Sequence, residues 1–293
     1  MSVTLGAIFV PTLAPERLRS VAGAADVAGV DELWMWEDCF RQGGLTSSAA
    51  ALAWTERIAV GIGIVPLPLR NAAVTAMEVA TLARVFGDRF VFGVGHGVQD
   101  WMAQVGARPA SPLTLMREHL TVTRDLFAGL RVTTSGRYVT LDDVGLDWPP
   151  PEPVPVHVGA TGPRTLALSG ELADGTVLTG GTTPEEVRSA VAVLDEARAA
   201  AGRTDPHRVT VFVRVATGDD ATARLAADAR AWGFDPDDPG RGVAGDAVAV
   251  AEGLRRWLDA GADAVVLQPT TDLTDHESFM RFAAERVRPE LLG

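Results

Sequence analysis

The sequence predicts an α/β fold, a (β/α)8 TIM barrel that takes up the whole chain, residues 1–293, as one domain. The first observation is the stretch 57–97, which reads as strand, loop, helix and strand: apolar residues alternate over 58–64, Ala72–Phe86 has a helical period, and Arg89–Val94 alternates again. Two strands that a helix joins lie parallel, with a right-handed crossover. The second observation is that about eight such units follow one another along the chain, which is typical of the barrel.

Each element is predicted from its local pattern. Strands are expected where apolar residues alternate or cluster in short runs that a Pro, a Gly or a polar residue ends: Val3–Val10, Glu32–Trp36, 58–64, Arg89–Val94, Val154–Val158, Gly175–Leu178, Val209–Ala216 and Asp263–Leu267. Helices are expected where the apolar residues follow a helical period: Pro15–Ala28, Leu45–Trp54, Ala72–Phe86, Leu113–Ala128, 163–173, Pro184–Ala201, Asp219–Ala231, Asp246–Ala260 and His276–Val287.

Two segments interrupt this alternation. Residues 130–153 combine a hairpin, with a turn at Ser135-Gly136, and a proline-rich lead-in to the next strand. Residues 232–245 carry Gly, Pro and Asp without periodicity, so an irregular insert is predicted there. The rival fold is a doubly wound open sheet, but the first strand is not followed by the glycine-rich turn that such a sheet uses to bind dinucleotides.

The composition excludes several classes of function. The formal net charge is -12 and every basic residue is Arg, so we expect neither nucleic acid nor an anionic membrane as a partner, because both need a basic face. The absence of Lys excludes lysine Schiff-base chemistry. We expect neither a signal peptide nor a membrane span. The one cysteine, Cys39, suits a reducing compartment, so a cytoplasmic protein is expected.

Ligands of such a barrel bind at the carboxyl ends of the strands. The best local motif there is Gly159-Ala160-Thr161-Gly162, which follows a strand and precedes a helix with Pro163 at its first position. Free amides at a helix N-terminus, together with the Thr161 hydroxyl, suit an anion. Gly180-Gly181, one unit later, would close the other side of a phosphate. A tight turn without a ligand explains the same residues equally well.

Asp38 and Cys39 follow the second strand. Asp38 or Glu37 is a candidate general acid or base, and a helix cap is the competing interpretation. Cys39 is expected to be a pocket or core residue rather than a nucleophile, because the flanking carboxylates raise the pKa of its thiol. Trp36 shares a strand face with Trp34 and could reach the barrel mouth, although packing in the core is the default interpretation.

His96 lies between Gly95 and Gly97, at the end of the fourth strand. A histidine there can supply a proton near neutral pH, or it can bond to a cofactor or to the backbone. Gln99 follows close behind and is a candidate for the substrate pocket. The other histidines show no metal-ligand spacing and the sequence has no Cys/His cluster, so no metal site is predicted.

Together these motifs resemble the luciferase-like monooxygenase superfamily. This group includes bacterial-luciferase-type flavin enzymes and oxidoreductases that use the deazaflavin coenzyme F420. The most specific segment is GIGIVPLPLRNAAVTAMEVATLARVFGDRFVFGVGHG, and the second is VGATGPRTLALSGELADGTVL. The resemblance implies that a flavin-like ring lies across the barrel mouth, with Gly63, Ile64 and Val65 behind it and Gly95 and Gly97 at its border. It also implies a non-proline cis peptide bond at Gly63-Ile64.

The same resemblance implies further features of the chain. The cofactor phosphate would rest on Gly159, Ala160, Thr161 and Gly162, and a homodimer would pair through Leu45–Trp54 and Ala72–Phe86. Several deazaflavin-dependent dehydrogenases of the group have Asp-His after the second strand, where this chain has Asp38-Cys39. The sugar-phosphate chemistry of those relatives is therefore not carried over.

The leading hypothesis is an F420-dependent oxidoreductase that moves hydride between the deazaflavin and a small organic substrate. His96 or Asp38 would be the proton source, and Trp36, Cys39 and Gln99 would line the substrate pocket. An FMN-dependent monooxygenase on the same barrel is the first alternative, because its phosphate turn would be the same. A non-catalytic flavin- or deazaflavin-binding barrel is the second, because the Asp-His pair is missing.

Overall fold

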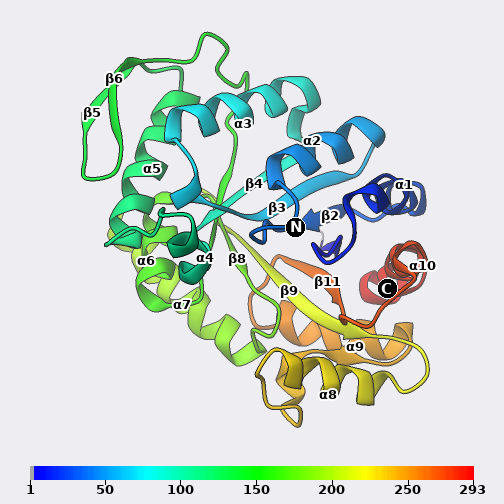
Figure 1. Cartoon of the computed structure of the whole chain (residues 1–293). Coiled ribbons are helices and arrows are strands. Elements are labelled where there is room, and N and C mark those ends of the chain that lie inside the picture. Colours follow the sequence, from blue (N-terminus) through cyan, green and yellow to red (C-terminus); the bar gives the residue numbers. More distant parts are fainter. Residues whose placement is uncertain (1–2) are drawn as a thin grey trace.

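The computed structural model describes residues 3–293, and these residues form a closed barrel of eight parallel strands (Figure 1). The strands are β1 (Thr4–Ile8), β2 (Glu32–Met35), β3 (Ala59–Pro66), β4 (Phe90–Gly95), β7 (Val156–Gly159), β8 (Gly175–Leu178), β9 (Arg208–Ala216) and β11 (Ala264–Pro269). They pair in chain order, β11 pairs with β1, and the pairing of β8 with β9 completes the ring. The predicted barrel is confirmed, and the doubly wound open sheet is wrong.

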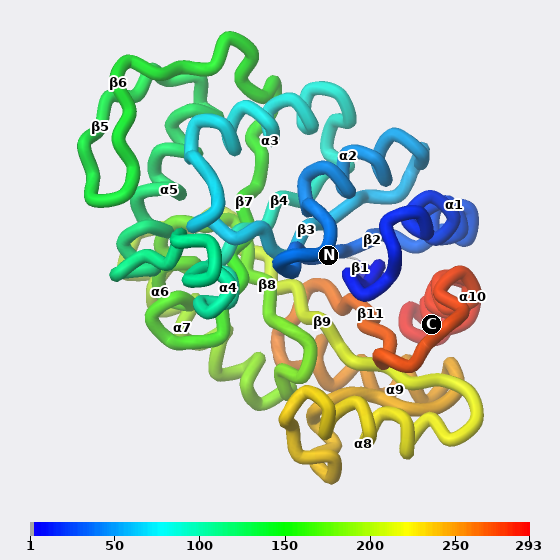
Figure 2. The backbone as a smooth tube through the Cα atoms, viewed as in Figure 1, coloured from blue at the N-terminus to red at the C-terminus, as the bar shows by residue number. Residues whose placement is uncertain are grey.

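Helices cover the outside of the strands (Figures 1 and 2). They are α1 (Leu18–Ala28), α2 (Gly44–Trp54), α3 (Ala72–Phe86), α5 (Pro112–Phe127), α6 (Pro163–Leu172), α7 (Pro184–Ala200), α8 (Ala221–Ala231), α9 (Ala247–Leu258) and α10 (His276–Arg281), which continues through a π-helical turn (Phe282–Val287) into α11 (Arg288–Leu292). Side chains cap several of them. Asn71 accepts the first free N–H groups of α3, and Thr183 and Glu186 form a reciprocal capping box at α7. Sequence reasoning missed α4 (Gln99–Gln104), in a stretch expected to be irregular.

Both predicted insertions contain short strands. The first contains the antiparallel hairpin β5 (Val132–Ser135) and β6 (Thr140–Val144), which stands beside α5 at the upper left of Figure 1. The Glu118 carboxylate on α5 accepts hydrogen bonds from three consecutive backbone N–H groups of the hairpin turn, 137–139. The second insertion, 232–245, is largely irregular, but it ends in a short strand that sequence reasoning missed, β10 (Val243–Ala244), which pairs with the end of β9.

Layers of side chains fill the barrel. The middle layer contains Ile8, Trp34, Val177, Phe212 and Val266. Because side chains on one face of a strand recur every second residue, the next layer towards the carboxyl ends contains Trp36, Arg214 and Gln268. Arg214 and Gln268 are direct partners across β9 and β11. This layer forms the floor of the barrel mouth.

Candidate active site

A bulge in β3 shapes one wall of the barrel mouth. The peptide bond between Gly63 and Ile64 is cis, as the resemblance implied, and the register between β3 and β4 shifts at this point. The half-buried Ile64 side chain lies between two neighbouring strands: a Cβ on Gly95 would stand 2.7 Å from its Cγ1, and a Cβ on Gly159 would stand 2.7 Å from its Cγ2. Gly95 and Gly159 are therefore required by the packing of Ile64, whatever else they contact. Val65, the next residue, is buried in the core.

Glu37 connects the loop after β2 to this bulge. Its backbone N–H donates to the Ile64 carbonyl oxygen at 3.2 Å. Its carboxylate accepts from the Gly44 N–H at the start of α2 and from Arg70 Nη2, each at 2.5 Å. Arg70 and Glu37 are largely buried, with side chains 18% and 10% exposed. This ion pair was not expected, because nothing local to either residue indicates that they meet.

Asp38 and Cys39 lie on the same loop, and the peptide bond after Cys39 is a second non-proline cis bond, which the sequence did not predict. Burial raises the pKa of the Asp38 carboxyl, and the Trp36 indole and Arg41 oppose that shift. Burial also raises the pKa of the Cys39 thiol, and the charges of Glu37 and Asp38 add to the effect. The expected direction for the thiol is confirmed, so Cys39 is a protonated thiol at neutral pH.

Trp36 lies over the middle layer of the barrel. Its ring centroid is 6.4 Å from that of Phe212, while Trp34 contacts the same ring edge-on at 5.6 Å from inside the core. Trp36 is half-buried, whereas Trp34 is fully buried. The two residues that share one strand face therefore divide between the core and the mouth.

His96 faces the start of α6. Its Nε2 lies 3.1 Å from Thr165 Oγ1, and burial lowers the pKa of the imidazole, so it is neutral at pH 7. His96 lines a cavity of about 440 Å³ together with Ser111 and Arg164. Thr165, the partner of the histidine, was missed because only the fold brings β4 and α6 together.

Gln99 folds back on its own loop. Its Nε2 donates to the carbonyl oxygens of His96, at 3.1 Å, and Gly97, at 3.4 Å. Gly97 has a φ of 66°, a left-handed conformation that favours glycine. These two hydrogen bonds from the Gln99 side chain therefore stabilise the loop after β4.

The turn between β7 and α6 is open on its outer side. Gly162 is the N-cap residue and Pro163 occupies the first turn of α6. Apart from its two chain neighbours, no atom of residues 3–293 lies within 4 Å of a Cβ placed on Gly162, so packing does not require a glycine there. Ala160 is buried, and its N–H donates to the Val177 carbonyl oxygen, which fixes the turn to β8. The first N–H groups of a helix lack acceptors within the helix.

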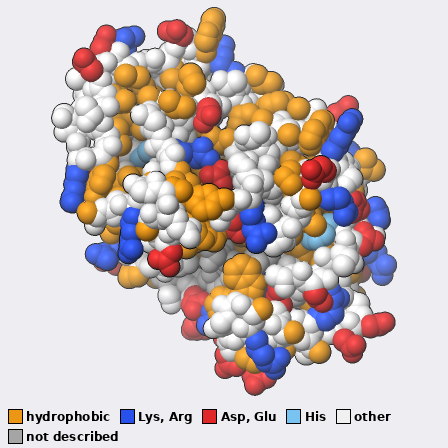
Figure 3. Space-filling model, in the orientation of Figure 1, with side chains coloured by type: hydrophobic (Ala, Val, Ile, Leu, Met, Phe, Trp, Pro, Cys, Tyr) orange, Lys and Arg blue, Asp and Glu red, His pale blue; other side chains and the backbone are white. Residues whose placement is uncertain are grey.

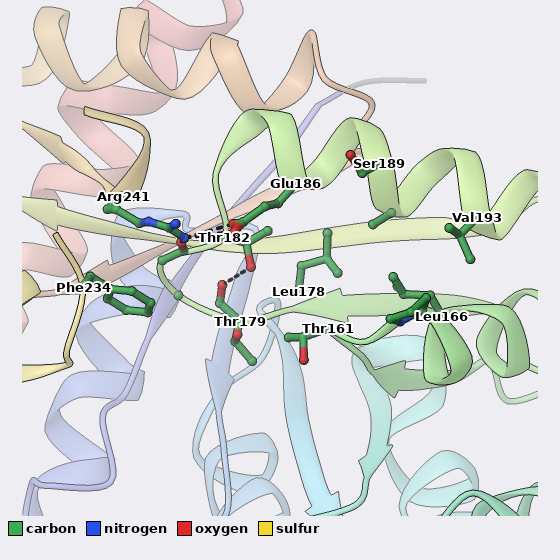
Figure 4. A pocket seen from close by; sticks show the side chains of 14 residues that line it. Thr161, Leu166, Leu178, Thr179, Thr182, Glu186, Ser189, Val193, Phe234 and Arg241 are labelled. Carbon is green, nitrogen blue, oxygen red and sulfur yellow. Dashed lines mark hydrogen bonds and ion pairs between the residues drawn. The ribbon is translucent and has the colours of Figure 1, made fainter. Parts of the chain in front are cut away.

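Thr161 and the Gly180-Gly181 pair line one cavity, as their positions in the sequence predicted. The cavity has a volume of about 360 Å³ and lies between α6, the loop after β8 and α7 (Figure 4). Gly180 lies so close to Gln268 that a Cβ would overlap its side-chain amide, and a Cβ on Gly181 would stand 2.6 Å from the Phe234 ring. The structure thus brings both glycine motifs together and gives each of the two glycines a packing reason.

Sequence reasoning missed the residues that the second insertion adds to this cavity. Phe234 and Arg241 line it from the left in Figure 4. Arg241 Nη1 donates to the Gly181 carbonyl oxygen at 2.7 Å and to Glu186 Oε2 at 3.0 Å. Its Nε lies 2.9 Å from Asp238 Oδ2. No local pattern in 232–245 indicates which strand the arginine would meet.

Arg214, on β9, contacts the same insertion from inside the barrel mouth. The Arg214 side chain is fully buried and forms an ion pair with the buried Asp228. Its guanidinium lies 5.2 Å from the centroid of Trp232 and 5.4 Å from that of Phe234. A charged group over the face of an aromatic ring is attracted to it, so Arg214 stabilises the position in which Phe234 lines the cavity.

Acidic and basic side chains are interspersed over the face shown in Figure 3, without a basic patch. Between residues 3 and 293 no three His, Cys, Asp or Glu side chains are grouped as metal ligands. No helix within that range is long and apolar enough to cross a membrane.

The chain is similar in sequence to proteins whose names include coenzyme F420 or a pterin substrate, and two of them are described here. The chain is 31% identical over 210 residues to a 5,10-methylenetetrahydromethanopterin reductase from Methanolobus tindarius, which covers 71% of this chain and 63% of the relative. It is 30% identical over 203 residues to an F420-dependent glucose-6-phosphate dehydrogenase from Microbacterium testaceum (strain StLB037), which covers 65% and 60%. The chain therefore spans less than two thirds of the length of these relatives.

Solved structures share the fold. An F420-dependent secondary alcohol dehydrogenase in complex with an F420-acetone adduct superimposes with a TM-score of 0.87 at 20% identity, over 99% of each chain. A type II Baeyer-Villiger monooxygenase from Pseudomonas putida in complex with FMN superimposes with a TM-score of 0.80 at 18% identity, again over 99% of each chain. The sequence model of the luciferase-like monooxygenase family matches residues 3–271, and the chain belongs to this family.

Proposed function

We propose that this protein is an oxidoreductase that binds coenzyme F420 and transfers hydride between the deazaflavin and a small organic substrate. The observation that carries the proposal is the cavity in which the N-terminal turn of α6 faces Gly180-Gly181, beside a mouth walled by Ile64. Pro163 has no N–H, and the Thr165 N–H donates to the Gly162 carbonyl oxygen at 3.0 Å. The Arg164 N–H and the Thr161 hydroxyl are therefore the donors that would hold a phosphate monoester or diester. The choice of F420 rests on the relatives named for it.

The residues would divide the work as follows. A bound deazaflavin supplies two-electron hydride chemistry at its C5 atom. Gly159, Ala160, Thr161 and Gly162 would hold the phosphate, with Gly180 and Gly181 closing the cavity opposite. Gly63, Ile64 and Val65 would support one face of the ring, and Gly95 and Gly97 would border it. The protein's main contribution would be positioning and exclusion of water.

Asp38 and His96 are the proposed proton sources. Asp38 lies beside Trp36 and Cys39, on the loop that would face the substrate, and burial raises the pKa of its carboxyl, so the protonated acid persists to higher pH than in a free side chain. His96 is neutral and paired with Thr165. Trp36, Cys39 and Gln99 are proposed to line the substrate pocket, with Gln99 acting through the loop that it braces.

Direct binding tests this proposal. Purified protein is titrated with F420 and, separately, with FMN, and the fluorescence of each cofactor is followed. We expect F420 to bind and the Gly162→Asp variant, which places a carboxylate at the helix N-terminus, to lose most of that affinity; Gly202→Asp, at an exposed left-handed position after α7, is the charge-matched control. Tight FMN binding without F420 binding would favour the monooxygenase alternative. F420 binding without turnover across a broad substrate panel would favour a non-catalytic barrel.

We also propose that the protein forms a homodimer. Helix α3, next to α2, exposes an apolar stripe in which Val74, Met77 and Val85 are 48%, 54% and 65% exposed. Light scattering of the wild type and of Met77→Glu would test it.

We also propose that the barrel and its two insertions form one domain, because β10 pairs with β9 and Glu118 holds the hairpin. The proposed location is the cytoplasm, which suits the one cysteine.

A further inference from the structure

The floor of the barrel mouth contains one polar side chain that no protein group engages. Two of its three members have a partner: the Trp36 indole interacts with the Asp38 carboxyl, and the Arg214 guanidinium forms an ion pair with the buried Asp228. The third, Gln268, is 7% exposed, and its side-chain amide has no hydrogen-bond partner among the residues that the structure describes. Buried amides are normally paired, so this one indicates a partner from outside the protein.

A molecule in the barrel mouth can reach the Gln268 amide. The unpartnered polar atoms that the described residues enclose completely belong to other side chains, so the amide oxygen and nitrogen of Gln268 both keep accessible surface. Gly180 makes room for them, because a Cβ at that position would overlap the amide oxygen and stand 3.3 Å from Nε2. The oxygen therefore lies against Gly180, and Nε2, with its two N–H donors, lies farther from it.

Gln268 lies across the barrel from the wall that Ile64 forms. In a closed barrel of eight strands, each strand lies opposite the one four places along the ring. Counted from β1, β3 and β4 are the third and fourth strands, and β9 and β11 are the seventh and eighth. A cofactor ring that rests one face on Ile64 therefore turns its other face towards β9 and β11. This geometry puts the Gln268 amide on the side where a substrate would lie.

The surroundings of the amide suit an uncharged group. The charge of Arg214 is matched by Asp228, so the floor has no unpaired cation for an anionic substrate. The ionised form of Asp38, on the adjoining loop, would repel an anion. The rings of Trp36 and Phe212, whose centroids are 6.4 Å apart, provide apolar surface beside the amide. A carbonyl or hydroxyl oxygen can accept from a neutral amide without a charge on either partner.

We propose that Gln268 binds the substrate, with Nε2 donating a hydrogen bond to an uncharged carbonyl or hydroxyl oxygen of that molecule. The inference rests on the proposed function, since it takes the substrate to lie between the cofactor ring and this side of the barrel. It also names the substrate class, an uncharged carbonyl compound or alcohol whose carbon skeleton lies beside Trp36. Sugar phosphates lie outside this class.

Two probes of one shape isolate the hydrogen bond. Cyclohexanone carries the acceptor oxygen, and methylenecyclohexane has a CH2 group in its place. NMR titrations measure the affinity of the full-length protein for each probe, with and without F420. The proteins compared are the wild type, Gln268→Met, which keeps the length of the side chain without its polar atoms, and Gln104→Met, the same change at an exposed residue of α4.

The affinity for cyclohexanone divided by that for methylenecyclohexane reports on the hydrogen bond. We expect this ratio to fall by about three- to tenfold in Gln268→Met, the contribution of one neutral hydrogen bond, and to stay unchanged in Gln104→Met. Altered packing would weaken both probes alike. An unchanged ratio in Gln268→Met therefore overturns the proposal.

A crystal soak of the wild type with cyclohexanone gives a readout that needs no variant. We expect the ketone oxygen within hydrogen-bonding distance of Gln268 Nε2. A ketone oxygen bound to another group, or no ketone in the mouth at saturating concentration, contradicts the proposal. Glucose 6-phosphate should not displace cyclohexanone, and displacement at equal concentration would overturn the uncharged substrate class.

Titration with F420 separates this inference from the proposed function. We expect the wild type and Gln268→Met to bind F420 with equal affinity. If neither binds it, the proposed function is wrong, and the ratio measured without F420 still decides the role of Gln268. If only the variant loses affinity for F420, the amide contacts the cofactor and its assignment to the substrate is wrong.

Discussion

Single residues connect the loops of the barrel mouth. Glu37 carries three of these connections, because its N–H reaches the Ile64 carbonyl while its carboxylate accepts from Gly44 and Arg70. The loop that carries Asp38 and Cys39 is therefore attached to both the β3 bulge and the start of α2. A charged group with this many partners in a largely buried place acts as a fixed support for its neighbours.

Replacement of Glu37 by Gln tests this support. Gln keeps one carbonyl oxygen for the Gly44 N–H but leaves the charge of Arg70 uncompensated, so the free energy of unfolding should fall by about 1–3 kcal/mol. Urea denaturation measures the loss. Glu185→Gln is the control, because it breaks an exposed i,i+3 pair with Arg188 and should change nothing measurable. An equal loss in the free energy of unfolding for the two variants would contradict the proposed role of Glu37.

Replacement of Asp38 should increase the free energy of unfolding, whereas replacement of Glu37 should decrease it. Burial raises the pKa of its carboxyl in the folded protein above 3.8, so the folded state favours the protonated form, and the stability of that form is lost as pH rises through the raised pKa. Asp38→Asn should then gain stability over the wild type at pH 7 and not below pH 3.8. The gain is a fraction of a kcal/mol, because solvent still screens the group. Urea denaturation across pH measures it, and a gain equal at every pH contradicts it.

Elements that depend on local pattern were predictable from the sequence. All eight barrel strands and the surrounding helices follow from short-range periodicity, and so does the β5–β6 hairpin. Thr161 of the turn at 159–162 and the pair Gly180-Gly181 line one cavity, as their positions after neighbouring strands predicted. The short β10 strand was not predictable, because two residues carry no period and its pairing with β9 is set by the fold.

Contacts between elements far apart in the chain could not be predicted. His96 meets Thr165, Glu37 meets Arg70, and Phe234 reaches the loop after β8, and no alternation or spacing indicates these pairs. The contact of Gly95 and Gly159 with a cofactor stays a prediction, and the structure adds that the Ile64 side chain packs against both glycines. A sequence pattern identifies a small residue, but only packing identifies what it accommodates.

The second insertion, residues 232–245, packs against the buried Arg214. Arg214→Met removes the charge that lies over the Trp232 and Phe234 rings. Among residues 3–293 it leaves the buried Asp228 carboxylate with Thr271 as its remaining donor. Loss of one partner of a buried ion pair costs about 3–5 kcal/mol, and residues 232–245 should exchange amide hydrogens faster. The double variant Arg214→Met/Asp228→Asn should recover part of the loss. A single-variant loss below about 1 kcal/mol, with unchanged exchange, would show that the insertion is held elsewhere.

The whole molecule contains several histidines whose burial affects its response to acid. Burial lowers the pKa of His119 to about 4, of His157 to about 3 and of His207 to about 4. In the unfolded chain each takes up a proton near pH 6.5, so the unfolded state binds more protons below that pH and stability falls as pH falls. Carboxylates with lowered pKa, such as Asp174, lose their contribution only below 3.8. Between pH 6.5 and 4 the loss of stability on acidification therefore comes from the histidines, and Asp38, whose pKa is raised, opposes it.

His119→Gln isolates one of them. His119 is 2% exposed within α5, and its Nδ1 lies 3.2 Å from Thr123 Oγ1. The free energy of unfolding of the wild type should fall between pH 7 and pH 4 by about 2–3 kcal/mol more than that of His119→Gln, since one proton over one pH unit corresponds to about 1.4 kcal/mol. Urea denaturation at pH 7, 5.5 and 4 measures the difference. Thr123→Ala, which removes the partner but keeps the titrating ring, should retain the wild-type slope. If His119→Gln retains that slope as well, His119 is not a source of the acid sensitivity.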